Sequence, residues 1–510
     1  MKAQVSTTRT GVNIASQWAL HLAIVGVNMF LIAYVLDRVG PEHYGGWAII
    51  ISIVGYMHLL GAGLSQAVQH FTAADHTRGD DRGMSALFSS ACIVYGLAAL
   101  LALPGSLAVA RYYAAIWPKI PTQAAAECSQ ALLWVSAAIV FSLLCIPAQG
   151  VLLGLQRHYL RNLIELVALI VRATVVVVTF QSLGPSLAYL GAALCAGACC
   201  RFVLYLLSLR IVAPGLRLNL SLVSRQALKR LLGFAGHSAV WSVCTVLLRD
   251  SGPLLAAWML GPAEITYLYA GTRVVRAFSG LVVGAGAVFL PIVSSLYATG
   301  EKARLGSVLV RGSRFGALIG LSGGACLILF GPAILYHWLG PGQETTLGVL
   351  VATTICLLGH WCFGMATIIL VGTRALKTVT AVQLTQLVGG IALGVVFSLA
   401  WGVTGLAAGL LLPLLLISLA VTPACAVRRA ETGLAKLYLK ALWAPAVVAG
   451  AVGLAAWAMQ RLWPPQQVWI LVTEGLLAMG FFGILSMLFG LDRATRKQIA
   501  QRLRGRFRAA

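Results

Sequence analysis

Long apolar runs follow one another along almost the whole of this chain, and they restrict its fold more than any other feature. A helix that crosses a bilayer needs roughly 20 predominantly apolar residues, and runs of about that length recur from residue 13 to residue 490. Of the 510 residues, 59% are hydrophobic and only 10% are charged, whereas soluble domains carry about 25% charged residues. The sequence therefore excludes an ordinary soluble protein and predicts an all-α polytopic membrane protein.

Polar breaks divide these runs into about 14 predicted transmembrane helices. They cover residues 13–36, 45–70, 84–108, 130–153, 163–181, 186–208, 233–258, 264–290, 314–337, 347–371, 378–399, 402–425, 437–459 and 467–490. At about 22 residues each, they take up roughly 300 positions. No remaining stretch is long and polar enough for a separate soluble domain, so a function that needs an extramembrane catalytic module is disfavoured.

Basic residues are divided unequally between the two sides of the membrane. Of the 37 Lys and Arg residues, 28 fall in connections on the side of the N-terminus, 4 on the opposite side, and 5 within or at the edges of helices. The positive-inside rule then predicts that both termini are cytoplasmic. Anionic lipid headgroups attract such segments, so the net charge of +23 indicates membrane lipids as partners, and nucleic acid is not needed to explain it.

Residue types that form metal, nucleotide or redox sites lack the spacing that such sites need. The eleven cysteines fall mostly inside apolar runs, where thiols act as small hydrophobic groups, and no CxxC pair or Cys/His ligand spacing is present. The glycine-rich stretch 284–286 lies within a predicted helix and lacks the strand, turn and lysine of a phosphate-binding loop. We expect no metal, no cofactor, no ATP hydrolysis and no catalytic residues, and we predict that the protein is not an enzyme.

The turn after the first predicted helix recurs later in the chain. Gly40-Pro41 and Gly261-Pro262 lie 221 positions apart, and the same shift carries Asn13, at the start of the first helix, to the start of the seventh. This spacing predicts two six-helix lobes, residues 1–210 and 211–430, two further helices over 431–490, and a basic cytoplasmic tail over 491–510. Transporters built from repeats bind substrate between the repeats near the bilayer midplane and expose it alternately to each side.

Five segments spread over the chain form a pattern. Residues 34–45 read YVLDRVGPEHYG, residues 150–157 read GVLLGLQR after Pro147, and residues 228–234 read LKRLLGF. Asp250 precedes the turn at 260–262 and Tyr267, and Pro291 ends the eighth predicted helix. These segments resemble the LGPEEYG, GLLxGLQR and LKRLLRFG segments of the Wzx-type polysaccharide flippases, a branch of the multidrug, oligosaccharidyl-lipid and polysaccharide exporter superfamily.

The resemblance implies two pseudo-symmetric helical bundles around a central cavity, in a bacterial cytoplasmic membrane. It further implies alternating-access transport of a polyprenyl-pyrophosphate-linked oligosaccharide for O-antigen, capsule or exopolysaccharide biosynthesis, with polysaccharide assembly enzymes as further partners. One departure concerns residues 58–64, HLLGAGL, where the family often has an Asp-Leu-Gly-Leu stretch. This difference weakens any role for a carboxylate in the second helix.

Charges at membrane depth are costly and mark candidate functional sites. Arg273 and Arg276 lie about ten residues into the eighth predicted helix and share a helical face with Tyr269. Because guanidinium groups match phosphate oxygens, a pyrophosphate bound between the two arginines would satisfy both. The alternative is that one arginine pairs structurally with an acid such as Asp250 or Glu165.

Two further predicted helices carry charges. Arg172, near the middle of the fifth, either lines the cavity or neutralises an acid from another helix, because Glu165 lies too far along the same helix for a direct pair. Arg249 and Asp250, adjacent in the seventh, point about 100° apart, so one can face the cavity while the other packs. We predict Arg172 and Arg249 as substrate ligands, and Asp250 and Glu165 as ion-coupling or structural residues.

Polar side chains form a stripe on the first predicted helix. Asn13, Gln17, His21 and Asn28 fall within an arc of about 80°. Such a stripe suits a hydroxyl-rich sugar in a wet cavity, so Gln17, His21 and Asn28 are candidate substrate ligands. Hydrogen bonding between helices is the alternative.

Two rival functions can be compared with this sequence. A cation-coupled small-molecule exporter of the same superfamily would be expected to bind cations through intramembrane carboxylates, but the first helix has no acid and arginine dominates the buried charges, which favours an anionic cargo. A membrane polysaccharide polymerase or ligase usually needs a large outer loop. The longest outer connection, about 109–129, offers only Arg111, Lys119 and Glu127 as charges, so this function is the less favoured.

Overall fold

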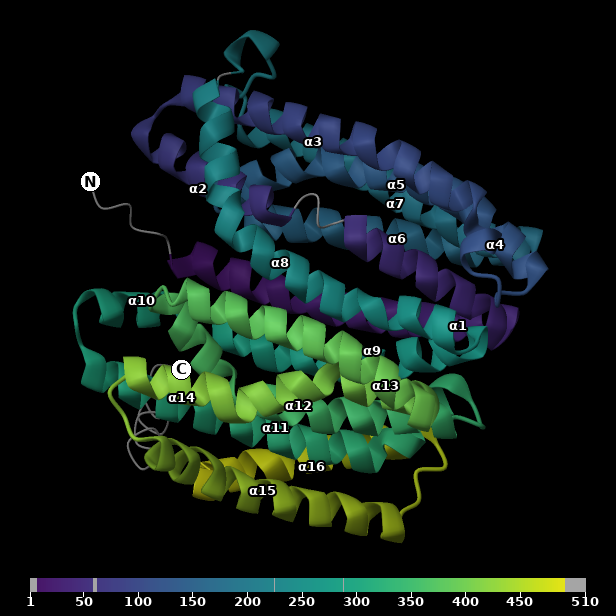
Figure 1. The fold of residues 1–510 in the computed structure, drawn as a ribbon, viewed down its shortest axis with the longest axis vertical. Coiled ribbons are helices and arrows are strands. Elements are labelled where there is room, and N and C mark those ends of the chain that lie inside the picture. The colour runs from purple at the N-terminus through teal and green to yellow at the C-terminus, as the bar shows by residue number, and fades with distance from the viewer. Residues whose placement is uncertain (1–6, 58–61, 224, 288, 491–510) are drawn as a thin grey trace. The chain divides into compact units, whose positions relative to one another are not determined.

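The computed structural model describes residues 7–57, 62–223, 225–287 and 289–490, and the regular structure within these ranges is helical, without strands (Figure 1). In chain order the elements are α1 (Thr7–Met57), α2 (Ala62–Arg78), α3 (Asp81–Arg111), α4 (Tyr113–Ile116), α5 (Thr122–Gly154), α6 (His158–Leu183), α7 (Leu187–Val212), η2 (Leu220–Leu222), α8 (Arg225–Met259), α9 (Pro262–Ala287), α10 (Leu290–Ala298), α11 (Lys302–Leu339), α12 (Glu344–Gly372), α13 (Leu376–Leu416), η3 (Ile417–Val421), α14 (Thr422–Arg429), α15 (Leu434–Leu462), α16 (Val468–Leu485) and η4 (Ser486–Gly490).

Two of these helices are hairpins with glycine at the bend. α1 turns at Gly40 (φ 77°, ψ 166°), and α13 turns at Gly402 (φ 56°). Glycine adopts a positive φ readily because it lacks a Cβ. The arms of α13 are antiparallel and very close, since a Cβ on Gly409 would lie 2.4 Å from the carbonyl oxygen of Leu393. Each hairpin therefore supplies two of the predicted helices.

Ten helical stretches in the described part of the chain are long and apolar enough to cross a membrane, and two of them contain the hairpins: Ser16–Met57 and Lys377–Arg429. This finding confirms the predicted all-α polytopic membrane fold. Some helices begin well before the predicted apolar run, as α11 does at Lys302 instead of residue 314. Leu305 and Leu309 are fully buried in this added stretch, while Lys302 and Arg304 are exposed. Hydropathy detects only the apolar remainder of such a helix.

The chain divides into two compact units, residues 1–266 (unit 1) and 267–510 (unit 2), which are described separately. The predicted boundaries at residues 210, 430 and 490 remain predictions. The predicted basic tail over 491–510 lies outside the described residues.

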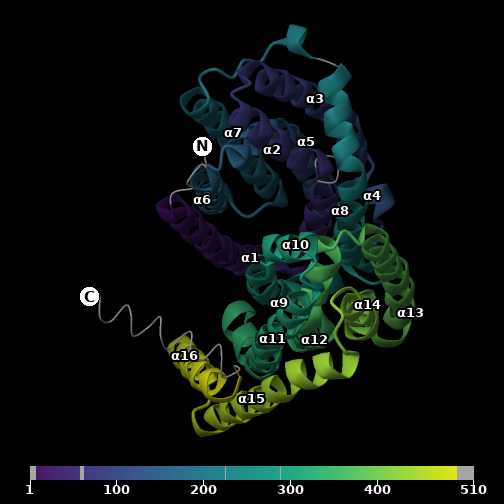
Figure 2. The same cartoon turned by 90° about the vertical axis from the view of Figure 1, so that its left-hand side faces the viewer.

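In unit 1, α5 packs between α3 and α7, with Leu132 and Leu152 fully buried. A Cβ on Gly191 of α7 would lie 2.4 Å from the carbonyl oxygen of Ala131 on α5, so only glycine permits this approach. Figure 2 looks nearly along the helices and shows α5 enclosed by α2, α3 and α7. The glycine thus allows α7 to approach α5 closely at this position.

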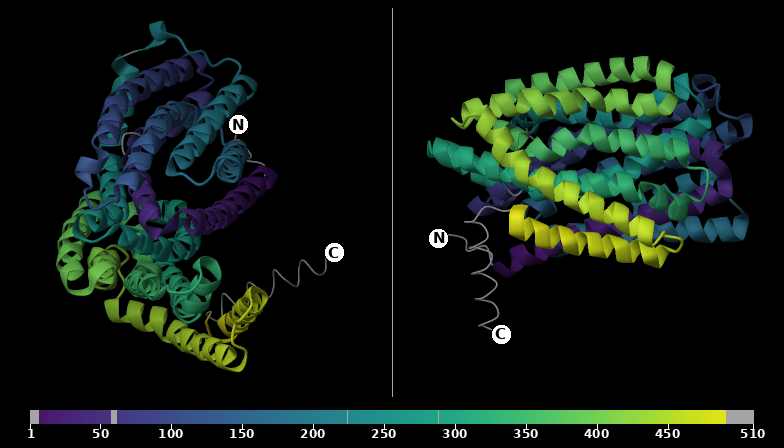
Figure 3. Two further views of the ribbon diagram at one scale, coloured as in Figure 1. Left: turned by 90° about the vertical axis from the view of Figure 1, so that its right-hand side faces the viewer. Right: turned by 90° about the horizontal axis from the view of Figure 1, so that it is seen from below.

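In unit 2, α11 packs against α12 and α15, and α16 lies along α15 (Figure 3). Phe330 of α11, Ala456 of α15 and Ala478 of α16 form a buried apolar cluster. Pro423 lacks the N–H that would bond to the carbonyl of Leu419, and the Tyr438 hydroxyl donates to that carbonyl instead. This bond satisfies the backbone where α13 passes through η3 into α14.

Candidate functional site

α9, which carries the two predicted arginine ligands, is held by one face against α11 and α12 of unit 2. A Cβ on Gly271 would lie 2.8 Å from the carbonyl oxygen of Thr346 on α12. Phe278 packs edge-on against Trp361, with ring centroids 5.0 Å apart, and the indole Nε1 of Trp361 donates to Ser279 Oγ at 3.0 Å. Gly271, the fully buried Val275 and Phe278 follow helical spacing and form the packing face of α9.

Arg273, Arg276 and Tyr269 lie on the opposite face of α9. At about 100° per residue they are centred about 160° around the helix from Gly271, and together they cover about 60°. All three are partly exposed. Arg273 is eleven positions after Pro262, which corresponds to about 17 Å along a helix about 39 Å long, so the arginines lie near its middle. The structure therefore groups these three predicted residues on the face that α9 does not use to pack against α11 and α12.

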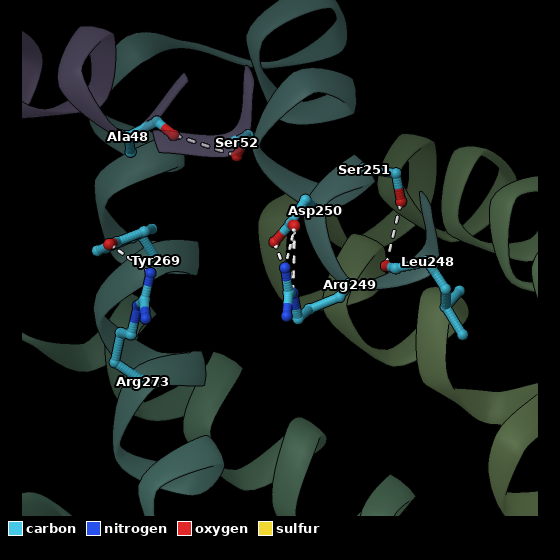
Figure 4. A network of polar contacts seen from close by, with 8 residues as sticks. All are labelled: Ala48, Ser52, Leu248, Arg249, Asp250, Ser251, Tyr269 and Arg273. Atoms are coloured by element: carbon cyan, nitrogen blue, oxygen red, sulfur yellow. Dashed lines mark hydrogen bonds and ion pairs between the residues drawn. The ribbon is translucent and has the colours of Figure 1, made fainter. Parts of the chain in front are cut away.

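Arg273 is held by an aromatic side chain. Its guanidinium lies 4.2 Å from the ring centroid of Tyr269, and its Nη2 donates to the Tyr269 hydroxyl at 2.5 Å (Figure 4). Among the described residues no acidic side chain lies within ion-pair distance of Arg273. The tyrosine orients the cation by a cation–π contact and leaves its charge unneutralised.

Arg172 of α6 contacts the polar stripe of α1 within unit 1. Its Nη2 donates to Asn28 Oδ1 at 2.7 Å, and Asn28 Nδ2 donates to the carbonyl of Ile24 at 2.7 Å. Further along the same two helices, Asn162 Nδ2 donates to Ser16 Oγ at 3.0 Å. The structure thus brings together Arg172 and Asn28, two residues that were predicted separately, and hydrogen bonds between helices account for part of the stripe.

The other two predicted residues of this stripe have different surroundings. Gln17 is exposed on α1. His21 is half-buried, and its Nε2 is buried without a hydrogen-bond partner among the described residues. An unsatisfied ring nitrogen is costly at this depth, so His21 has capacity for one further polar partner.

Arg249 and Asp250 of α8 form an ion pair with each other. Arg249 Nη2 lies 2.7 Å from Asp250 Oδ2, and Arg249 Nε donates to both carboxylate oxygens at 3.1 Å (Figure 4). The Arg249 side chain is 49% exposed and that of Asp250 13%. Asp250 lies directly on the second arm of α1, since a Cβ on Gly55 would lie 2.2 Å from its Oδ2. The carboxylate occupies the space that the missing side chain leaves.

Glu165 has partners on a neighbouring helix, which helical spacing alone does not reveal. Its Oε2 lies 3.3 Å from Arg201 Nη1, and its Oε1 accepts a bond from the Tyr205 hydroxyl at 3.0 Å. Arg201 Nη2 also donates to Ser142 Oγ at 3.0 Å, so this network joins α5, α6 and α7. Arg201 is the one charged residue in its apolar run over 187–209, and this signal could have identified it as a partner for an intramembrane acid.

The two Gly-Pro turns of the internal repeat lie against each other within unit 1. The Thr266 hydroxyl donates to the carbonyl of Pro41 at 2.6 Å, and a Cβ on Gly45 would lie 2.0 Å from the carbonyl oxygen of Pro262. Lys119 Nζ donates to the carbonyl of Met259, which directly precedes the second turn, at 2.9 Å. The first two of these contacts join the two turns at one end of the unit, and we call them the turn–turn contact.

At the ends of α2 and α3 lies a buried acid outside the membrane-spanning stretches. Asp75 is almost fully buried, and its Oδ2 lacks a hydrogen-bond partner in the described ranges. Burial raises the pKa of the Asp75 carboxyl, and the charge of Arg230 offsets part of this effect. This carboxyl is a stability feature at the edge of unit 1, separate from the residues above.

No group of three or more His, Cys, Asp or Glu side chains that could hold a metal ion occurs in the described part of the chain. The cysteines are all free thiols.

Comparison with solved structures identifies the fold. The chain is similar to a structure of the lipid II flippase MurJ in an inward closed conformation, with 14% identity and a TM-score of 0.72 over 94% of this chain and 98% of that one. It is also similar to an inward-facing multidrug resistance MATE family transporter of the MOP superfamily, with 14% identity and a TM-score of 0.65 over 82% of this chain and 95% of that one. The chain therefore has the two-lobed fold of these transporters.

Sequence comparison gives a match over part of the chain. The chain is 23% identical over 342 residues to the uncharacterized membrane protein EpsK of Bacillus subtilis (strain 168), and the match covers 66% of each protein. This chain thus spans slightly less than two thirds of that relative's length. No family model matches the sequence.

Proposed function

We propose that this protein is a flippase that moves a polyprenyl-pyrophosphate-linked oligosaccharide across the bacterial cytoplasmic membrane by alternating access, as a step in surface polysaccharide biosynthesis. Two kinds of finding support this proposal: the charge and position of the arginines in α9, and the fold shared with a lipid II flippase. In this proposal the protein moves its cargo without making or breaking a covalent bond.

The observation that carries the proposal is the lack of an acidic partner beside the Arg273 guanidinium among the described residues. It is a cation near the middle of α9, a helix that the sequence predicts to span the membrane, and its observed partner is the neutral ring and hydroxyl of Tyr269. A charge at that depth requires a counter-charge or water. A pyrophosphate supplies the counter-charge with matching geometry, because its oxygens accept the paired N–H groups of a guanidinium. Arg276, one turn away on the same face, would share the anion.

The polar residues of unit 1 suit the sugar part of such a substrate. Asn28, His21 and Gln17 offer amide and imidazole groups that can exchange hydrogen bonds with hydroxyls, and Arg172 holds Asn28 in place. In the proposal the prenyl chain stays in lipid while the sugar occupies the polar face. Arg249 binds the substrate through the exposed half of its side chain, and Asp250 couples ion binding or fixes Arg249.

Alternating access requires one end of the molecule to close while the other is open. The turn–turn contact joins both repeats, with Gly45 of the first directly on the backbone of Pro262 in the second. We propose that it is the seal on the side opposite the termini, and that it separates when the substrate is released outward. With both termini in the cytoplasm, as the charge distribution predicts, that side is the outer one.

The test measures flipping directly. Purified protein is reconstituted in proteoliposomes with a short polyprenyl-pyrophosphate oligosaccharide, and an external glycan-cleaving enzyme reports how much sugar reaches the outside. Arg273→Ala is compared with Arg273→Lys, which keeps the charge and loses the guanidinium fork. Arg304→Ala is the matched control, because Arg304 is exposed and pairs with Glu301 on the same helix turn.

We expect the parent to flip the lipid-linked sugar, Arg273→Ala to slow flipping by about 10- to 150-fold, as the loss of a charged hydrogen bond of about 1.5–3 kcal/mol would, and Arg304→Ala to match the parent. Equal flipping by Arg273→Ala and the parent would keep the function and remove this site. A parent that moves a small soluble solute but no lipid-linked sugar would favour the exporter of the same superfamily.

A further inference from the structure

The connection between α7 and α8 has an unusual distribution of polar and apolar groups. Residues 214–223 run back over α3, and hydrogen bonds hold them there. The backbone N–H of Arg217 donates to Ser85 Oγ at 3.2 Å, and that of Asn219 donates to Ser89 Oγ at 3.0 Å. Ser89 Oγ in turn donates to the carbonyl of Arg217 at 3.4 Å. We call these residues the 214–223 loop.

The match between loop and helix follows from their geometry. Two serines four positions apart on a helix are about 6 Å apart along its axis, and alternate residues of an extended chain are about 6.6 Å apart. Ser85 and Ser89 therefore reach alternate backbone groups of the loop, and both serines are buried. Within the loop, Asn219 Oδ1 accepts bonds from the backbone N–H and the hydroxyl of Ser221 at 2.9 and 2.8 Å. These polar groups of the loop thus form hydrogen bonds within the protein.

Two of the apolar side chains of the same segment, Leu218 and Leu220, are exposed, whereas Leu216 and Leu222 are half-buried. Leu218 is 64% exposed and Leu220 71% exposed, and Ile211 at the end of α7 is 81% exposed. A loop in water usually has the opposite arrangement, with polar side chains outward. Because hydrogen bonds hold the loop on α3, the two leucines stay exposed to whatever surrounds the protein.

Charge and position identify that surrounding. Residues 210–230 contain five basic residues, Arg210, Arg217, Arg225, Lys229 and Arg230, and no acid. One acid, Asp81 at the start of α3, lies beside the loop, since a Cβ on Gly215 would lie 3.6 Å from its Oδ2, and it offsets only part of this basic charge. In the view along the helices, the loop lies at the rim of unit 1, beyond α3 and the start of α8 (Figure 2). A rim position at the ends of the helices is where headgroups meet acyl chains.

We propose that the 214–223 loop is a membrane-surface anchor, in which Leu218 and Leu220 insert into the acyl region and Arg217 and Arg225 bind the phosphates of anionic lipids in the adjoining leaflet. The chemistry is that of interfacial segments with basic and apolar residues together. The anchor fixes the start of α8 relative to the bilayer surface. It does not depend on which substrate the protein carries.

The test places a fluorophore at the loop. Leu220→Cys is labelled in nanodiscs, and quenching by a lipid with a nitroxide near the headgroup is compared with quenching by iodide in water. Thr77→Cys, exposed at the end of α2 in the same unit, is the matched control position. The parent, labelled in parallel, gives the background from the native cysteines. The nanodiscs contain phosphatidylglycerol or only phosphatidylcholine.

With phosphatidylglycerol, we expect lipid quenching to exceed iodide quenching at residue 220 by at least threefold, and the reverse at residue 77. Replacing Arg217 and Arg225 by Gln should remove the difference between the two lipids at residue 220. Iodide quenching at residue 220 as strong as at residue 77 would overturn the proposal, because the leucines would then be exposed to water, as a binding surface for a soluble protein would be. An unchanged lipid preference in the Arg217→Gln/Arg225→Gln variant would also contradict the assigned role of the arginines.

Discussion

Gly45→Ala tests whether the turn–turn contact closes one end of the protein. An alanine Cβ at this position would lie 2.0 Å from the carbonyl oxygen and 2.8 Å from the carbonyl carbon of Pro262. Real Cβ atoms essentially never approach within 3.0 Å of another heavy atom, so the two turns must separate by about 1 Å. Overpacking of this kind typically costs about 1–3 kcal/mol. The upper half of that range applies, because backbone atoms cannot rotate away as a side chain can.

This cost falls on the closed state and is absent once the turns have parted. A destabilisation of about 2–3 kcal/mol shifts the ratio of closed to open protein by about 30- to 150-fold. Thr266 reports the change, because it is buried and bonded to Pro41 when the turns meet. We expect a cysteine at residue 266 to react with a membrane-impermeant maleimide at least tenfold faster in the Gly45→Ala variant.

The matched control is Gly96→Ala. Gly96 lies in α3, and a Cβ added there would have no other atom within 4 Å, so the same substitution adds a methyl group without a clash. Unchanged reactivity at residue 266 in a folded Gly45→Ala protein would refute the argument that the two turns form a seal. Equal acceleration by Gly96→Ala would attribute the effect to something other than the contact with Pro262.

Three further predictions concern stability. Glu165→Gln and Arg201→Gln should each lower the free energy of unfolding by about 1–3 kcal/mol, because each leaves a partly buried charge without its partner. The double variant should lose less stability than the sum of the two single variants. Additive losses in a thermal-shift cycle would contradict the pairing. Burial raises the pKa of the Asp75 carboxyl, so its ionised form destabilises the fold at pH values above the ordinary pKa of about 3.9. Asp75→Asn should therefore raise the melting temperature near pH 7.5, and this gain should vanish below about pH 4. A gain that persists at low pH would exclude this cause. Gly55→Ala should lower the melting temperature, because the added Cβ would lie 2.2 Å from the Asp250 carboxylate. The loss should be much smaller in an Asp250→Ala background. Equal losses in both backgrounds would show that this contact is not the reason.

The sequence predicted well the features that depend on the composition of a continuous segment. Most helix ends lie within several residues of the predicted spans, because the length of an apolar run follows the thickness of the membrane. An exception is α11, which begins at Lys302 instead of residue 314. The hairpin bends at Gly40 and Gly402 fall between predicted helices or at the start of one, where a residue without a Cβ lets the chain turn. Helical spacing also placed Arg273 on the same face as Tyr269, and the structure contains that contact.

Helical spacing could not predict which side chains on different helices contact each other. Glu165 was predicted to lack a partner on its own helix, but only the packing of α6 against α7 reveals Arg201 as its counter-charge. In the same way, only the packing of α6 against α1 reveals that Arg172 donates to Asn28.

The physical reason is that helical periodicity within one segment is fixed by local geometry, whereas the neighbours of a helix depend on residues far away in the chain. The approach of α7 to α5 depends on Gly191 meeting Ala131, and that of α9 to α12 on Gly271 meeting Thr346. A glycine in the sequence indicates that a close approach is possible, but not which helix approaches. The sequence by itself therefore determined the membrane fold and the candidate charges, and only the tertiary structure decided which of those charges are neutralised and which face of each helix remains for a ligand.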